Sequence, residues 1–225
     1  QTYVRLSGAQ TTTLTSGADA TVTDADLQNA WSNFVNKESI DISLVLTADA
    51  TTNIQNYVIS NIASARADCV AFVSPENTVT GDPIVGNTSS EADAIVAFRN
   101  EMNTIHSYAV MDSGYKYQYD RYNDKYRWVP LNADVAGLCA RTDYTNDPWF
   151  SPGGLNRGQI KSVVRLAFNP TKTQRDELYK NGVNPVVTFP GEGTVLFGDK
   201  TLLKRPSAFD RINVRRLFIV LEKAI

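Results

Sequence analysis

The sequence has few of the residues that carry most protein chemistry. It contains one histidine, His106, and two cysteines, Cys69 and Cys139, which lie far apart in the chain. One histidine cannot build a histidine-based metal cluster, and neither cysteine has a second ligand at metal spacing. We therefore expect two buried, reduced thiols that behave as small apolar side chains, and no metal site.

Long apolar runs and an excess of one charge are also missing. The longest apolar run extends from Leu217 to Leu221, whereas a membrane-spanning helix needs about 20 residues. Lys and Arg number 22 against 24 Asp and Glu, a formal net charge of −2. Such a balance gives no field that would attract nucleic acid or an anionic membrane, so neither is expected as a partner.

The composition is typical of an ordinary globular chain, with 42% hydrophobic residues among 225. At this length a folded chain buries roughly 70% of the surface of its unfolded form, so it needs no disulfide or metal staple. Thr and Ser crowd residues 1–17, which favours an extended arm over residues 1–22 that joins a missing neighbouring domain. Residues 23–225 are expected to form one core domain. Because the chain starts at Gln1 and stops within a helical pattern, we expect a fragment of a longer protein.

Helical and strand patterns alternate in the first half. Buried strands are predicted at 40–46, 69–73 and 108–111. Asp24 is predicted to cap one helix, a second is predicted to begin at Thr52 or Asn53, and a third at a capping box formed by Ser90 and Asp93. His106 falls at the end of the last of these. This order favours an α/β sandwich with an at least partly parallel sheet.

The second half mixes hairpins and helices. Tyrosine-rich segments at 115–119 and 126–129 predict an antiparallel hairpin, 160–168 predicts a strand, and 185–189 and 194–197 flank a turn. Helices are expected after Asn132, after a capping box of Thr171 with Gln174, and after Ser207 or Asp210. The fold class is therefore mixed α/β, a mixed sheet with flanking helices and an antiparallel Tyr-rich hairpin.

The last helix offers the sharpest candidate site. Its apolar stripe is expected to face the core and consists of Val214, Leu217, Phe218, Leu221 and Ile225. Its other face is basic, and arginine is favoured at protein interfaces because its planar fork makes bidentate contacts. We therefore predict an interface made by Arg211, Arg215, Arg216 and Lys223, with a solvated helix face as the alternative.

Other motifs favour plain structural explanations. The spacing of Gly191-Glu192-Gly193 fits neither a P-loop nor a dinucleotide fingerprint, so it predicts a turn. The Gly-rich loop at 153–158 is expected to let backbone segments approach closely, although an anion nest is conceivable. For the tyrosines between residues 115 and 126, packing within the sheet is the favoured explanation, and a protein–protein contact surface is the second. No carboxylate spacing identifies an acid/base pair, so no catalytic or cofactor residue is assigned.

Taken together, the segments resemble the sheath proteins of phages with contractile tails. The resemblance depends on order and spacing from Ile40 to Ile225 rather than on any single motif. The matching segments are GAD at 17–19, TDADL at 23–27, IDISLV at 40–45, VAGLCARTD at 135–143, PWFSPGG at 148–154, RG at 157–158, GVNP at 182–185, GEG at 191–193, FGDKT at 197–201 and NVRRLF at 213–218.

The resemblance implies a structural role and no enzyme activity. Sheath subunits form a helical homopolymer around a tail tube, and a baseplate signal lets them rearrange and drive the tube through the host envelope. It implies residence in the virion tail after assembly in the host cytoplasm, and makes the four basic residues candidate subunit or tube contacts. From the resemblance we expect that the family's N-terminal arm and its C-terminal, tube-contacting region are missing here. Residues 152–154 read Pro-Gly-Gly, where the resemblance leads us to expect Pro-Ala-Gly.

Two other functions stay open from the residues. An α/β enzyme domain with an unrecognised site would need a deep pocket with convergent polar groups. A host-recognition or decoration module would use the Tyr-rich hairpin to bind its partner.

Overall fold

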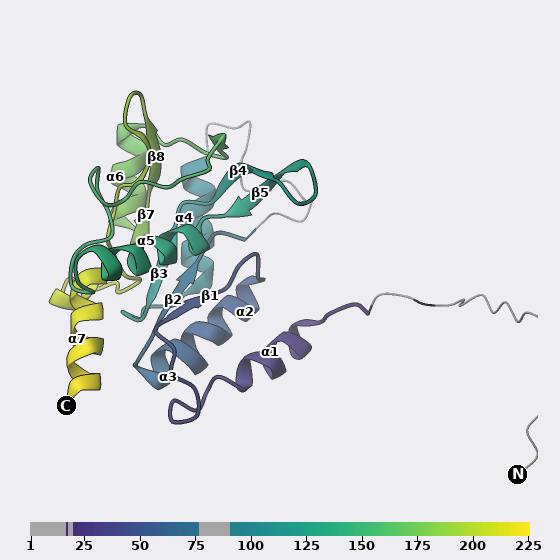
Figure 1. Ribbon diagram of the computed structural model, residues 1–225, viewed down its shortest axis with the longest axis vertical. Coiled ribbons are helices and arrows are strands. Elements are labelled where there is room, and N and C mark those ends of the chain that lie inside the picture. Colours follow the sequence, from purple (N-terminus) through teal and green to yellow (C-terminus); the bar gives the residue numbers. More distant parts are fainter. Residues whose placement is uncertain (1–16, 18–19, 77–90) are drawn as a thin grey trace, which may run out of the picture.

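A parallel four-stranded sheet forms the centre of the structure, a computed structural model that describes residue 17 and residues 20–76 and 91–225 (Figure 1). The strands are β1 (Leu44–Leu46), β2 (Val70–Val73), β3 (Ala109–Asp112) and β7 (Val183–Asn184). They follow in that order across the sheet, and every neighbouring pair is parallel. The prediction of a partly parallel sheet is therefore confirmed.

Both faces of this sheet are packed. Successive side chains of a strand point to opposite faces, so Ala71 and Val73 lie in one apolar cluster while Val70 and Phe72 lie in the other. All four residues of β2 are buried. A strand buried on both sides reads as a continuous apolar run, which explains why the sequence pattern located this strand correctly.

The first core lies between the sheet and a group of helices. They are α1 (Asp24–Ser32), α2 (Thr52–Tyr57), the π-helix η1 (Val58–Ala63), α3 (Ser64–Arg66), α4 (Glu91–Met102) and α6 (Lys172–Lys180). Fully buried Ile59 and Ile62 of η1 and Ile95 of α4 fill this core. By contrast, α1 has no buried residue, and its Leu27 and Trp31 cover the core from outside.

The second core lies on the opposite face, under α5 (Asn132–Thr145) and α7 (Ile212–Ala224). Val135 of α5 and Ile212 and Ile219 of α7 pack there against Val70 and Phe72. A short 3-10 helix, η2 (Ala208–Asp210), precedes α7. In the described part of the chain, no helix is long and apolar enough to cross a bilayer.

Two antiparallel units flank the parallel sheet. In the first, β4 (Tyr115–Asp120) pairs with β5 (Lys125–Pro130) on one edge and with β6 (Arg165–Leu166) on the other. The second is the hairpin of β8 (Val186–Phe189) and β9 (Gly193–Leu196). The Tyr-rich hairpin and the mixed α/β class are therefore confirmed, with the strands divided among three sheets.

Two predicted strands are shorter in the structure than the apolar runs that suggested them. From the run at 40–46 only Leu44–Leu46 form a strand, because β2 pairs with those three residues alone. From the run at 160–168 only Arg165–Leu166 pair, with Tyr117 and Lys116 of β4. Ser162 has a φ of 57° and breaks the extended backbone just before that pairing.

Several helix starts differ from the prediction by a residue or more. Thr23, rather than Asp24, caps α1, since its hydroxyl accepts from the backbone N–H of Asp26 in a capping box. The side chain of Asn132 does not cap α5, because its amide donates to the carbonyl of Ala48 at 2.8 Å. Ser207 caps η2, and Arg211 occupies the N-cap position of α7.

Other local predictions have mixed outcomes. The capping box of Thr171 with Gln174 is confirmed, and α6 ends before Gly182, whose φ is 81°. His106 was expected at a helix end, but α4 ends at Met102 and His106 lies in the connection beyond it, 3.1 Å from the Ser64 hydroxyl. Ser90 of the other capping box, and residues 1–16 and 18–19 of the expected arm, lie outside the described residues, so the arm at 1–22 and the core domain at 23–225 stay predictions.

A buried carboxyl joins the carboxyl ends of β2 and β3 to the start of α5. Asp112 is 1% exposed, and its oxygens accept from the Ser74 hydroxyl at 2.7 Å and the Gly114 N–H at 2.8 Å. The Ser74 oxygen in turn accepts from the backbone N–H of Asn132 at 3.0 Å. Burial raises the pKa of Asp112 from its ordinary 3.8 to about 8.

The raised pKa predicts a pH-dependent stability. Between about pH 4 and pH 8 the folded protein holds a proton on Asp112 that the unfolded chain has lost, so the free energy of unfolding falls as pH rises. Asp112→Asn imitates the neutral carboxyl and is expected to remove this part of the slope. Urea unfolding across that range measures it, with the exposed Asp93→Asn as control. An unchanged slope in Asp112→Asn would contradict the assignment.

Candidate functional site

Arg215 of the predicted interface lies inside the protein, 8% exposed, between two aromatic rings. Its guanidinium carbon is 4.1 Å from the ring centre of Tyr108 and 4.2 Å from that of Phe209. The guanidinium also donates to the Ser107 hydroxyl at 2.6 Å and to the Tyr108 hydroxyl at 3.0 Å. A stacked and hydrogen-bonded guanidinium holds α7 against the segment that leads into β3.

Arg216 fixes the opposite flank of the same helix. It is 6% exposed, and its guanidinium donates to the Asp143 carboxylate at 2.5 Å and to the carbonyl of Pro148 at 3.4 Å. Asp143 is in the last turn of α5, and Pro148 lies in the loop that follows. The ion pair therefore joins the two helices that cover the second core.

Arg211 and Lys223 remain more accessible, with side chains that are 45% and 34% exposed. Arg211 pairs with the Asp199 carboxylate at 2.5 Å and donates to the Tyr179 hydroxyl at 2.6 Å. The hydrogen bond to Asp199 is the largest cause of the raised pKa of Arg211. Lys223 pairs with Asp41 at 2.7 Å, which lowers the pKa of that carboxyl.

The structure thus places the four basic residues on separate partners rather than in one basic patch. The expected orientation of α7 is wrong: the buried positions are Ile212, Arg215, Arg216 and Ile219, while Phe218 and Leu221 are 37% and 46% exposed. These buried positions follow i, i+3, i+4 and i+7, so two stripes of helical period compete in this sequence. The aliphatic part of an arginine side chain can be buried when its guanidinium has hydrogen-bond partners. The partners of Arg215 and Arg216 therefore determine which face of α7 points inward.

The glycine-rich motifs have the structural uses that were predicted. Gly191 and Gly193 have φ of 86° and 83° and form the turn between β8 and β9. In the 153–158 loop, a Cβ on Gly158 would lie 2.7 Å from the Leu196 carbonyl oxygen and 2.8 Å from that of Gly154. Glycine is therefore required for the loop to lie against β9.

The tyrosine strip packs on itself along the hairpin. Tyr117 stacks on Tyr126 with ring centres 5.4 Å apart and meets Trp128 at 4.8 Å. Arg165 of β6 lies over both Tyr117 and Trp128 at 5.1 Å. Sheet packing therefore explains these residues, while Tyr122 at the turn is 98% exposed.

The reactive groups of the described residues are buried or scattered. Both thiols are free and buried, as predicted, and burial raises the pKa of Cys69 and of Cys139 to about 12. Within the described ranges, no three or more His, Cys, Asp or Glu side chains gather at metal-binding distance. Sequence reasoning missed the buried Asp112 and Arg99, because an ordinary Asp or Arg carries no motif that signals burial.

Comparisons with known proteins agree on one family. The family model described as "Phage tail sheath protein central domain" matches residues 20–202. The tail sheath protein of Enterobacteria phage T4 is 45% identical over 220 residues, covering 92% of this chain and 33% of the phage protein. That of Vibrio phage KVP40 is 44% identical over 225 residues, covering 93% and 34%. The chain therefore spans about a third of the length of these relatives.

Solved structures show the same fold at low sequence identity. The helical sheath of the anti-feeding prophage in its contracted state superposes with a TM-score of 0.64 at 18% identity, over 92% of this chain and 51% of that one. The sheath complex of PVC, an extracellular contractile injection system, in its contracted state gives 0.62 at 20% identity, over 82% and 46%.

The two arginine ion pairs of α7 predict different coupling energies. A double-mutant cycle on Arg216→Ala and Asp143→Ala is expected to give about 1 to 3 kcal/mol, because the arginine is buried. The same cycle on the exposed pair of Arg211 with Asp199 serves as the matched control and should give under about 1 kcal/mol. Chemical denaturation measures both, and equal couplings would contradict the structural role of Arg216.

Proposed function

Because this chain belongs to the phage tail sheath protein family, we propose that it is the central part of a contractile tail sheath subunit. Copies polymerise as a helical homopolymer around a tail tube, and a baseplate signal makes them rearrange and drive the tube through the host envelope. The protein is then a component of the virion tail, assembled in the host cytoplasm. The family match over residues 20–202, which includes residues of both cores, carries this proposal.

The packing supports a subunit that keeps its shape while its neighbours change. Apolar clusters fill both faces of the parallel sheet, and buried Arg215 and Arg216 fasten α7 to the body of the protein. A lattice with two arrangements stores the difference between two sets of interfaces, so the subunit itself has to be rigid. Catalytic groups have no part in this function, and the family is one of structural sheath proteins.

The predicted interface on α7 is proposed in a modified form. Arg211 and Lys223, at the two ends of the helix, are the accessible members of the set and are the candidate contacts to another subunit or to the tube. Arg215 and Arg216 act from inside, because their burial turns Phe218 and Leu221 outward. The contact face proposed for α7 is therefore partly apolar, with a cation at each end.

The proposal predicts assembly by the full-length protein. We expect hollow helical tubes in electron micrographs of the purified full-length protein, and none from the 225-residue chain used as control. Helical polymers need contacts on two different faces of each subunit, and this chain is only about a third of its relatives' length. A full-length protein that stays monomeric over a range of protein and salt concentrations would contradict the proposal.

A further inference from the structure

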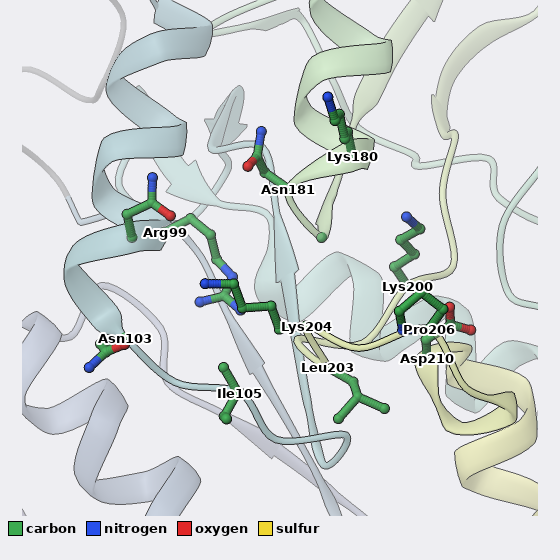
Figure 2. A pocket seen from close by; sticks show the side chains of 12 residues that line it. Arg99, Asn103, Ile105, Lys180, Asn181, Lys200, Leu203, Lys204, Pro206 and Asp210 are labelled. Carbon is green, nitrogen blue, oxygen red and sulfur yellow. The ribbon is translucent and has the colours of Figure 1, made fainter.

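A basic cavity of about 560 Å³ opens between the C-terminal ends of α4 and α6 and the connection from β9 to α7 (Figure 2). Four cationic side chains line it: Arg99, Lys180, Lys200 and Lys204. Asp210 is the one carboxylate among the lining residues. It already pairs at 3.6 Å with the guanidinium of Arg211, a residue that does not line the cavity. The cavity is therefore positive in the described residues.

Arg99 is the member of this cavity that most needs an anion. It is 7% exposed, one guanidinium nitrogen donates to the Leu202 carbonyl at 2.9 Å, and its Nε has no hydrogen-bond partner in the structure. Figure 2 shows its side chain running from α4 into the cavity, which Lys204 also lines. Burial lowers the pKa of Arg99, the expected effect of desolvating a cation.

None of these four cations forms an ion pair with a carboxylate of the described residues. A helix C-terminus favours a cation, which accounts for Arg99 and Lys180 in the last turns of α4 and α6. Lys200 lies outside the helices, but its ammonium group donates to the carbonyl of Tyr179 at 3.0 Å and lies 4.3 Å from the centre of that ring. Neither explanation applies to Lys204, which also lies outside the helices.

We infer that this basic cavity is an anion site that receives a carboxylate side chain from a second copy of the protein. The inference rests on the proposed function, because a helical polymer supplies the second copy. A guanidinium fork with ammonium groups beside it matches a carboxylate, and exposed carboxylates such as Glu177 and Glu192 are present on the chain surface. A cavity on one copy that takes a different surface of the next makes a head-to-tail contact, the type from which open helical polymers grow.

Inorganic phosphate is the probe for the cavity in the 225-residue chain. Titrated at low ionic strength and followed by amide chemical shifts, it should perturb residues around Asn181 and Lys204. Arg99→Gln is expected to weaken binding about tenfold, equivalent to about 1.4 kcal/mol. Lys204→Gln replaces an exposed cation with a neutral side chain, so the fold should be kept, and it should weaken phosphate binding about threefold. Lys172→Gln, at the other end of α6 from Lys180, is the matched control and should bind as the wild type does.

The second arm tests the carboxylate of a second copy, in the full-length protein. Lys204→Gln is expected to raise the concentration needed for polymer to sediment, whereas Lys172→Gln leaves it unchanged. Phosphate should inhibit wild-type polymerisation more strongly than that of Lys204→Gln.

The outcomes distinguish the anion site, the source of its carboxylate and the proposed function. Phosphate binding that neither Arg99→Gln nor Lys204→Gln weakens would overturn the site itself. Weakened phosphate binding with unchanged polymerisation would overturn the second copy as the source of the carboxylate. A wild-type protein that forms no polymer at all would contradict the proposed function, and with it the inter-copy contact, whatever the phosphate titration gives.

Discussion

The central constraint on this protein is that its parallel sheet has to be covered on both faces. β2 sends Ala71 and Val73 to one side and Val70 and Phe72 to the other, so neither side can be left in water. The first face is covered by helices that lie near the sheet in sequence, such as η1 between β1 and β2. The second face depends on α5 and on α7 at the far end of the chain. Anything that detaches α7 therefore exposes part of that core.

The covering of the second face explains why charged residues are inside. Arg215 and Arg216 occupy core-facing positions of α7, and each is compensated, one by two rings and two hydroxyls, the other by a carboxylate and a carbonyl. A buried cation with partners ties elements together, whereas one without them carries a desolvation cost. Arg99 is buried to a similar degree, yet among the described residues its guanidinium has a single hydrogen bond, to the carbonyl of Leu202, and its Nε, like that of Arg215, has no partner. This smaller set of partners distinguishes Arg99 in the basic cavity from the arginines that hold the fold.

A subunit with these properties suits the mechanical role proposed for it. Two apolar cores and buried arginine contacts keep the body intact, while the accessible features lie on its surface: the partly apolar face of α7, the tip of the Tyr-rich hairpin and the basic cavity. Changes of lattice can then take place between copies rather than within them. Rigidity inside and exchangeable contacts outside are two consequences of the same packing.

The sequence by itself determined the features that depend on neighbouring residues. The capping box of Thr171 with Gln174, the β4–β5 hairpin, the β8–β9 turn and the continuous apolar run of β2 each carry a local signal, and each was predicted close to its place. Strand lengths at 44–46 and 165–166 were set by how far a partner strand extends. The inward face of α7 and the gathering of Arg99, Lys180 and Lys204 were decided only by the tertiary structure. These side chains come from distant segments, and a charged residue is buried or exposed according to partners that its own neighbourhood in the sequence does not reveal.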